Sequence, residues 1–563
     1  MTGRKLFGRK NEVLLMDGYF RFILFFAGGI FVFFLSGGAL VAIGQVKTHS
    51  GHRMGIVDFR ASCTEPAQAK FNEALALLHH MTYPQARQAF EQATATDARC
   101  AMAHWGIAVT LFQPLWPTRP KPDELKRGWE AVIKAKEIQP STERERLFVE
   151  AAEAFFLEPQ SNDYWLRIRR WEAAMAKIYK AFPDDPDAAA FYALAHLATT
   201  PSNVISREHA DRAAEILLRV YNRYPEHPGA MHYLVHANDV PGRENELLEI
   251  TRKYDSVAPR NPHALHMPTH IYTRLGDWNG VIAGNTRAAE AALEYPAGAN
   301  GEYIWDEFAH AIEYLVYAHL QKGADDAAAG ELKRMLDAVR LEPSFKTAFH
   351  IASSQARLAI ERRDWNAAAA LVPREPANLA WDRFAWAEAI IQFGRGYGAA
   401  RRGNVKEAKA VVARLEVLEN ATVKAGEDLF ARNIRVLRLE LSAWNAHLEG
   451  QKEKSLELMR EATALETSTP KHAVTPAPTV PAYELLGDLF MELKQPSDAL
   501  AAYKKSLALY PRRFNSLLGA ARSARAAGDK ASARGFYQEL LKTADGGTRK
   551  LPLDEARKYA PQK

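Results

Sequence analysis

Histidines between residues 228 and 274 have the residue type and the spacing of a metal site. His232 and His236 form an H-x-x-x-H pair, and His266 and His270 form a second such pair 34 residues later. Residues four apart lie on one face of a helix, so each pair offers two imidazoles on the same side. Imidazole nitrogens are good ligands for Cu, Zn and Fe. The repeated pair therefore predicts four imidazoles converging on one transition-metal ion of undetermined identity.

Further side chains in the same repeat register extend this candidate site. His310 and Glu313 are additional candidate ligands, and Glu313 and Tyr317 are the candidate catalytic residues. Glu313 is the nearby carboxylate best placed to act as a general base. The outer candidates are His196, His263 and Asp239. Because the sequence does not fix the number of ligands, three alternatives are left open: a closed structural site, a dinuclear site, and an open catalytic site for oxidoreduction or hydrolysis.

The elements that position these histidines are predicted to be helices throughout. Ala, Leu, Glu, Lys and Arg dominate after the N-terminal segment, without long alternating β-branched runs, and turn signals recur every fifteen to twenty residues. A period of about 34 residues is that of a helix–turn–helix solenoid repeat. We therefore expect an all-α superhelix of stacked helical hairpins.

The C-terminal region carries the clearest repeat. It contains Leu486-Gly487, Phe490, Ala499, Tyr503 and Pro511 at fixed offsets, and its Ala and Tyr recur 34 residues later as Ala533 and Tyr537. This pattern resembles the tetratricopeptide repeat (TPR). In TPR proteins, positions two, five and nine of the first helix line the concave groove. The resemblance places the two histidine pairs at positions five and nine, inside that groove.

A second resemblance covers most of residues 60–370. The segments MHYLVHANDV and HALHMPTHIYT resemble a group of bacterial exported TPR proteins that share H-Y-x-x-H-x-x-D and H-A-x-H-M-P-x-H-I signatures. The resemblance implies an exported protein with a histidine site, and it names no reaction.

The N-terminus predicts the compartment. Residues 22–46 contain no charged side chain and are long enough to span a membrane as a helix. The preceding residues are rich in Lys and Arg, so the positive-inside rule leaves the N-terminus in the cytoplasm. A small-x-small sequence at Ala42-Ile43-Gly44 leaves cleavage possible. We favour a retained single-pass anchor in the cytoplasmic membrane, with the bulk of the protein in the periplasm or another extracytoplasmic space.

The predicted organisation has seven parts along the chain. They are a cytoplasmic segment 1–21, a transmembrane or signal-anchor helix 22–46, a degenerate TPR array with the histidine-rich groove 60–345, further degenerate helical pairs 346–466, a Pro-rich linker 467–481, two clean TPRs 482–547 and a tail 548–563.

Composition, motifs and cysteine content restrict the classes of function that the chain can have. A formal charge of +6 is spread among interspersed acids and bases, and no nucleic-acid-binding motif is present, so a nucleic-acid partner is not expected. The chain also lacks a Walker loop, G-x-S-x-G, H-E-x-x-H and C-x-x-C. Cys63 and Cys100 are either one disulfide or two buried thiols.

Two functions follow as alternatives. The first is a membrane-anchored, exported TPR solenoid whose groove holds a transition-metal site for metal handling or metal-dependent chemistry. The second is a non-catalytic TPR scaffold that binds a protein or peptide at the outer face of the cytoplasmic membrane. The first requires imidazole nitrogens that converge within about 4 to 5 Å, whereas the second allows them to spread along the groove.

Overall fold

A computed structural model describes residues 52–116, 119–161, 163–201, 203, 205, 207–298 and 300–560. The chain divides into a short unit, Met1–Thr48, and a large unit, His49–Lys563. The predicted membrane helix at 22–46 lies outside the described residues. Within the described part, no helix is both long and apolar enough to cross a membrane.

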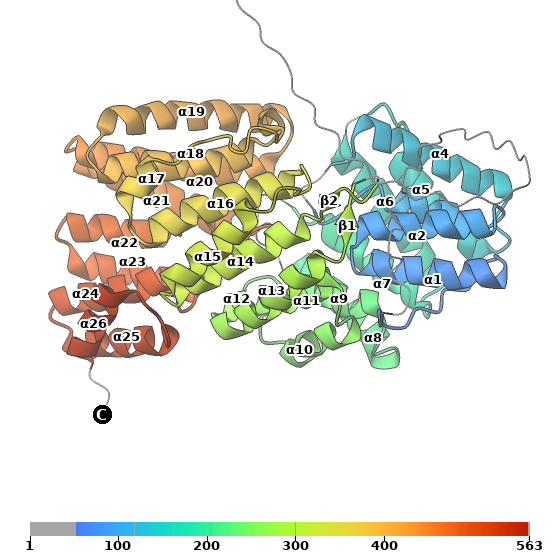
Figure 1. Cartoon of the computed structure of the whole chain (residues 1–563), viewed down its shortest axis with the longest axis horizontal. Helices are drawn as coiled ribbons and strands as arrows, with labels where there is room; N and C mark the ends of the chain where they lie inside the picture. Colours follow the sequence, from blue (N-terminus) through green and yellow to red (C-terminus); the bar gives the residue numbers. More distant parts are fainter. Residues whose placement is uncertain are drawn as a thin grey trace, which may run out of the picture. The chain divides into compact units, whose positions relative to one another are not determined.

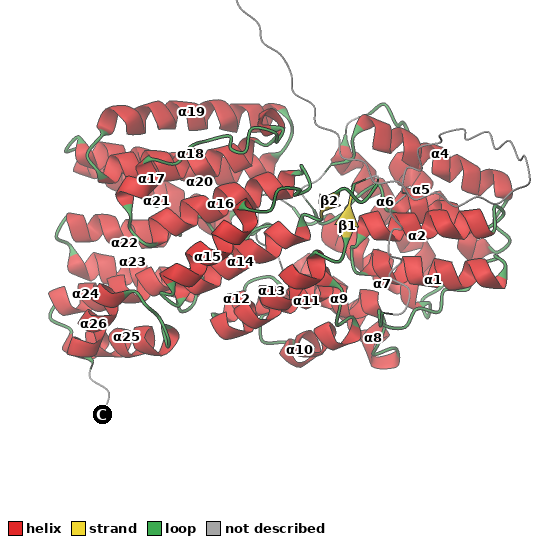
Figure 2. Cartoon of the chain, in the orientation of Figure 1, coloured by secondary structure: helices red, strands yellow, loops and turns green. Residues whose placement is uncertain are grey.

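The first half of the large unit consists of helix pairs that are consecutive in sequence and pack against each other (Figures 1 and 2). These pairs are α1 (Glu65–His79) with α2 (Tyr83–Thr96), α3 (Ala101–Val109) with α4 (Pro122–Ile138), α5 (Glu143–Phe156) with α6 (Tyr164–Ala181), α7 (Pro186–Ala198) with α8 (Glu208–Arg223), and α9 (Pro228–Asn238) with α10 (Leu248–Val257).

The second half continues the pattern. Its elements are α11 (Pro262–His266) and α12 (Pro268–Leu275) with α13 (Trp278–Ala292), α14 (Glu307–Gln321) with α15 (Asp325–Leu336), α16 (Phe345–Glu361) with α17 (Trp365–Ala369), α18 (Ala385–Arg401) with α19 (Val405–Lys424), α20 (Asp428–Leu448) with α21 (Lys452–Ser468), α22 (Ala482–Glu492) with α23 (Pro496–Leu509), and α24 (Phe514–Ala526) with α25 (Lys530–Thr543). A two-stranded antiparallel ladder, β1 (Pro296–Ala297) and β2 (Tyr303–Ile304), precedes α14, and a 3-10 turn, η1 (Trp381–Arg383), precedes α18.

Local sequence explains where these helices begin and end. The side chains of Asp185, Asn261 and Asp277 each accept a hydrogen bond from the N–H three residues later, which satisfies an otherwise free donor in the first helical turn. Gly276 ends α12 with φ at +66°, and a Cβ there would lie 2.8 Å from the carbonyl oxygen of Pro511. Only glycine combines that left-handed turn with that close approach.

Two contacts join helices that lie far apart in the sequence. Helix α1 contacts α9, and α14 contacts α24. The inner helices bury almost every side chain, as along α14, where all but one residue from Glu307 to Gln321 is buried. The predicted all-α solenoid of helical hairpins is confirmed, and its inner surface is packed rather than open.

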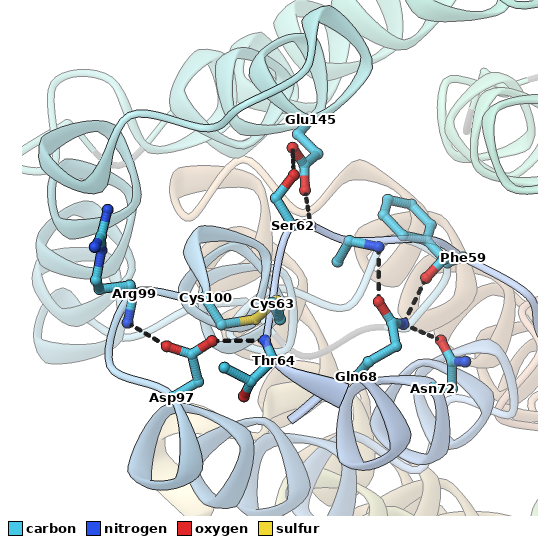
Figure 3. Close-up of a disulfide and its surroundings, with 11 residues drawn as sticks. Phe59, Ser62, Cys63, Thr64, Gln68, Asn72, Asp97, Arg99, Cys100 and Glu145 are labelled. Carbon is cyan, nitrogen blue, oxygen red and sulfur yellow. Dashed lines mark hydrogen bonds between the residues drawn. A yellow bond between two sulfur atoms is a disulfide. The ribbon is translucent and has the colours of Figure 1, made fainter. Parts of the chain in front are cut away.

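Cys63 and Cys100 form a disulfide that joins the segment before α1 to the start of α3. Around it, Asp97 accepts hydrogen bonds from the backbone N–H groups of Thr64 and Arg99 (Figure 3). The bond ties the first helical hairpin to the second. Of the two alternatives for Cys63 and Cys100, one disulfide or two buried thiols, the structure has the disulfide.

Two segments near the C-terminus pack against the rest of the solenoid. The Pro-rich stretch 467–481 packs across the inner helices, with Val474, Ala477 and Val480 buried, and we call it the strap. The tail 548–563 contains a helix, α26 (Lys550–Tyr559), that packs against α25 through buried apolar side chains such as Leu553. Burial of its apolar face explains why this polar segment does not stay irregular.

Candidate metal centres

Three imidazoles from α9 and α11 form the first cluster, which we call triad A. His232 and His236 lie one turn apart on α9, and their Nε2 atoms are 3.2 Å apart. His263 on α11 places its Nε2 3.1 Å from that of His232. His232 and His263 are completely buried. Three ring nitrogens therefore converge from two neighbouring hairpins.

Three imidazoles from α11, α12 and α14 form the second cluster, triad B. The Nε2 atoms of His266 and His270 lie 2.9 Å apart, and the ring centroids of His266 and His310 lie 4.2 Å apart. Within each triad, one ligand atom from every histidine lies within 4.8 Å of the others. Pro268 interrupts the helix between His266 and His270, yet Met267 keeps helical dihedral angles, so the i,i+4 relationship survives.

The two triads are neighbours. The His263 and His266 rings are 6.2 Å apart, and the His236 and His270 rings are 6.3 Å apart. The indole of Trp116 lies edge-on to His263 and to His310, with ring centroids 5.5 and 5.8 Å away. Trp116 thus contacts one member of each triad.

Two of the three remaining ring nitrogens of triad A, those of His232 and His263, are held by acceptors. His232 Nδ1 lies 2.6 Å from the backbone carbonyl of His79, and His263 Nδ1 lies 3.1 Å from Glu307 Oε2. Lys346 binds the other oxygen of Glu307. Because a carbonyl and a carboxylate can only accept, both Nδ1 atoms carry the proton.

Acceptors also hold the remaining nitrogens of triad B. His266 Nδ1 lies 2.7 Å from Asn285 Oδ1, and His270 Nδ1 lies 2.9 Å from Asp239 Oδ2. His310 Nδ1 lies 3.1 Å from His350 Nε2, and His350 Nδ1 in turn lies 2.5 Å from Glu313 Oε2. Since Glu313 fixes the proton of His350 on Nδ1, the Nε2 of His350 accepts and His310 donates from Nδ1. His310 Nε2 is buried and has no partner among the described residues.

These hydrogen bonds leave unshared electron pairs facing each other. With the proton on Nδ1, each neutral imidazole presents a lone pair on Nε2. The Nε2 atoms of His232 and His263, and those of His266 and His270, then approach to 3.1 and 2.9 Å without a hydrogen atom between them. Two lone pairs at that distance repel unless a cation lies between them. Outer hydrogen bonds that fix the tautomer of a ligating histidine are typical of metal sites.

Burial sets the charge state of the site. Burial lowers the pKa of His232, His266 and His310 well below the usual value, which favours the neutral imidazole that binds metals. Burial alone would raise the pKa of Asp239, but Lys471 and Arg274 hold it well below its usual range. The carboxylate behind His270 is therefore ionised.

Several predicted site residues lie elsewhere. Glu313 lies behind His350 and contacts Ser353 and Arg357, so it is neither beside a free imidazole nitrogen nor placed as a general base. The hydroxyl of Tyr317 accepts a hydrogen bond from Arg513. His196 pairs with Glu172, outside both triads. Glu313 follows His310 by three residues and projects toward α16 instead.

The grouping also differs from the expected set of four imidazoles, His232, His236, His266 and His270. His263, expected as an outer residue, joins His232 and His236, whereas His266 and His270 join His310. Asp239 contacts His270 only through Nδ1. Sequence reasoning missed Glu307, Asn285 and His350. A histidine in the next inner helix, α16, was the available signal for His350.

The strap is connected to both ends of triad B. Lys471 of the strap lies 2.9 Å from Asp239 Oδ2, behind His270. Arg357 donates to the carbonyl oxygens of Ala477 and Pro478 in the strap and lies 3.3 Å from Glu313 Oε1, behind His350 and His310. The C-terminal half therefore positions two of the three imidazoles of triad B.

A third cluster contains two histidines and a carboxylate. Asp187 Oδ1 lies 2.9 Å from His79 Nε2 and 3.3 Å from His227 Nε2. On the opposite sides of the rings, His79 Nδ1 faces the hydroxyl of Tyr233, and His227 Nδ1 accepts from the N–H of Ala230. Each ring here has one donor and one acceptor contact, so neither imidazole presents a free lone pair to a metal. Asp187 Oδ2 is buried and has no hydrogen-bond partner among the described residues, and Arg144 lies 3.8 Å from it.

Comparisons with known proteins bear on the fold. No family model and no curated protein match the sequence. Among solved structures, the chain is similar to the APC/C hetero-tetramer Cut9-Hcn1 (14% identity, 89% of this chain, 90% of that chain, TM-score 0.33). It is also similar to a human IFIT1 dimer with PPP-AAAA, with 11% identity over 84% of this chain and 89% of that chain and a TM-score of 0.37. A third similar structure is yeast Tom70, with 12% identity over 88% of this chain and 96% of that chain and a TM-score of 0.29. Within the chain itself, consecutive helical hairpins pack on one another, which is the arrangement of a helical-repeat solenoid. The chain has a TPR-type helical solenoid fold.

Proposed function

We propose that triad A and triad B each bind one transition-metal ion, Cu, Zn or Fe, and that the TPR-type solenoid serves to hold this pair of metals. The observation that supports the proposal most strongly is the pair of Nε2-to-Nε2 contacts between imidazoles whose Nδ1 protons are already bound to acceptors. A metal ion in each triad would turn those repulsive contacts into coordination.

The geometry of the triads fits such ions. Bonds of about 2.0 to 2.1 Å to a tetrahedral metal place two ligand nitrogens about 3.3 Å apart. The Nε2 separations of 2.9 to 3.2 Å are close to that value. The ligands are all imidazole, without thiolate, which suits Cu, Zn and Fe alike. The residues present therefore fit the proposed ions.

Three protein ligands favour a reactive site over a purely structural one. Structural zinc sites have four protein ligands, whereas catalytic sites have three and keep an open position. An ion with an open position can polarise a bound water or substrate, and copper or iron can also exchange electrons. We therefore favour metal-dependent oxidoreduction or hydrolysis, or metal handling, over a structural role.

The alternative of a peptide-binding groove has less support. That function requires histidines spread along an accessible concave surface. In α9, α11, α12 and α14 the histidines instead converge, and all but one of the six, His236, are buried. Partner binding at another surface of the solenoid remains a prediction.

The proposed location is extracytoplasmic, with residues 22–46 as the membrane anchor. The Cys63–Cys100 disulfide supports this proposal, because such bonds persist in oxidising compartments. Fusion of a reporter that folds only in the periplasm to the C-terminus tests it. Reporter activity is expected, and an active cytoplasmic reporter at the same position would contradict the location.

Elemental mass spectrometry of the full-length chain tests the metal proposal. We expect two ions per chain in the parent and one in either His263→Ala or His310→Ala. The double variant His232→Ala/His266→Ala, which removes one ligand from each triad, should hold none. His227→Ala is the matched control and should keep both ions. A parent that takes up no metal on titration, or equal loss in the control, would contradict the proposal.

A further inference from the structure

A cleft of about 510 Å³ lies beside the triads. It is lined by residues of α2, the segment between α3 and α4, α16, η1 and α19. Its walls are strongly aromatic and include Tyr83, Phe112, Trp116, Trp305, Phe345 and Phe430. The volume is in the range of small-molecule sites. Aromatic walls of this kind favour a flat ring, which can stack on them or meet them edge to face.

The innermost wall of the cleft is shared with the candidate metal centres. Trp116 lines the cleft and also lies edge-on to His263 of triad A and His310 of triad B. Lys346, another lining residue, lies over the Trp116 ring and binds Glu307, the partner of His263. A molecule at this end of the cleft is thus separated from both triads by one indole ring.

One cationic side chain that lines the cleft, Arg87, makes no direct polar contact with the described residues. Among the lining acids, Asp306 pairs with Lys346, Glu427 with Arg119, and Asp382 with Arg374. Glu124 and Glu342 also line the cleft and lie near enough to act electrostatically on Arg87, but neither forms an ion pair with it. Arg87 on α2 is half-buried, and it has no hydrogen bond or ion pair with any residue that the structure describes. Burial, together with Arg127, lowers its pKa, against the opposing effect of Glu91, Glu124 and Glu342. A guanidinium in this position binds a carboxylate well, because its N–H groups match both oxygens.

We propose that this cleft binds a small aromatic carboxylate, with its carboxylate on Arg87 and its ring against the aromatic wall that ends at Trp116. The inference rests on the proposed function in one respect: the bound molecule is a substrate only if the triads hold metal. Binding itself depends on the cleft alone. This difference allows the two proposals to be tested separately.

Isothermal titration calorimetry on the full-length chain, metal-free and copper-loaded, tests the cleft. The probes are benzoate, 4-hydroxybenzoate and indole-3-acetate, with their methyl esters and cyclohexanecarboxylate as controls. We expect at least one aromatic acid to bind and its ester and the non-aromatic acid to bind at least tenfold more weakly. Arg87→Gln should weaken binding of that acid at least tenfold.

Arg127→Gln is the matched control, because it removes an equal charge close to Arg87 on an exposed position that does not line the cleft. It should change the affinity less than twofold. Arg87→Lys, which keeps the charge but not the two-pronged contact, should give an intermediate affinity and guards against a folding defect in Arg87→Gln. If no aromatic acid binds, or if both Gln variants behave alike, the inference is overturned.

Copper absorption separates the two proposals. In the copper-loaded chain, the bound acid should shift the visible copper band, and Arg87→Gln should abolish the shift at the same probe concentration. If the chain binds no metal but still binds the acid through Arg87, the cleft stands and the proposed metal function fails. If copper binds normally but no acid does, only the cleft inference fails.

Discussion

The two triads and the His79–Asp187–His227 cluster are all built around buried imidazoles. They differ in the direction of the hydrogen bonds that those imidazoles make. In the third cluster, every imidazole donates on one side and accepts on the other, and the carboxylate lies between the two rings. In the triads, five of the six imidazoles, all but His236, donate outward to Glu307, Asp239, Asn285, His350 and a backbone carbonyl. The free nitrogens point inward at one another. The contrast teaches that convergence of histidines is not enough, and that the direction of their protons separates a structural network from a metal site.

Metal removal gives the largest expected effect. A metal at one hundred times its Kd stabilises the folded state by about 2.7 kcal/mol per site, so two sites contribute about 5 kcal/mol. Urea unfolding with and without a chelator measures this difference. His227→Ala should show the same chelator effect as the parent, and His232→Ala/His266→Ala should show none. A chelator effect that survives in the double variant would place the metal elsewhere.

Asp187→Asn should lower stability without changing metal content. It removes two charge-assisted hydrogen bonds from buried histidines, each contributing about 1.5 kcal/mol or more, so we expect a loss of about 3 kcal/mol. Asp184→Asn, at an exposed aspartate of the same turn, is the control and should change stability by less than about 0.5 kcal/mol. Loss of metal in Asp187→Asn would show that the third cluster is also a metal site.

Substitutions behind the ligands should affect one triad each. Lys471→Met removes the strap contact to Asp239 and should weaken metal binding at triad B about tenfold. Lys346→Met removes the partner of Glu307 and should weaken triad A by a similar factor. Competition with a chromophoric chelator, in His263→Ala for triad B and His310→Ala for triad A, resolves the two affinities. Equal effects of Lys471→Met on both triads would contradict the assigned connection to the strap.

His80 gives the smallest effect, seen as a pH dependence. Burial lowers the pKa of this residue to about 3 in the folded chain, against about 6.5 unfolded. Between these values the unfolded chain binds a proton that the folded chain does not, so stability falls as the pH falls, by about 1.4 kcal/mol per unit. His80→Gln should reduce the slope of unfolding free energy between pH 6 and 4 by about this amount. His447→Gln, a half-buried histidine near the end of α20, is the control, and an equal change there would contradict the assignment.

Much of the fold could be predicted from local sequence. The 34-residue period, the small and aromatic residues of the C-terminal repeats and the i,i+4 histidine pairs all depend on one or two helices. Packing of distant segments could not be predicted in this way. The contact of α1 with α9 and the strap contact from Lys471 to Asp239 join residues far apart in the chain.

The candidate site shows the same limit of prediction from local sequence. Register alone paired His232 with His266, because the two occupy equivalent positions in consecutive repeats. In the folded chain, His232 instead meets His263, one helical turn earlier than His266, since stacked helices can shift along their axes by a turn. Glu313 was assigned to the site on its position in the repeat register, but its side chain lies against His350 of α16. The composition of the site was therefore readable, and its division into two triads was not.

Anomalous X-ray scattering at the absorption edge of the bound metal, from crystals of the metal-loaded full-length chain, tests the central claim most directly. We predict two peaks per chain, one among His232, His236 and His263 and one among His266, His270 and His310, with none at His79, Asp187 and His227. A peak at the third cluster, or metal-loaded crystals with no peak in either triad, would contradict the account.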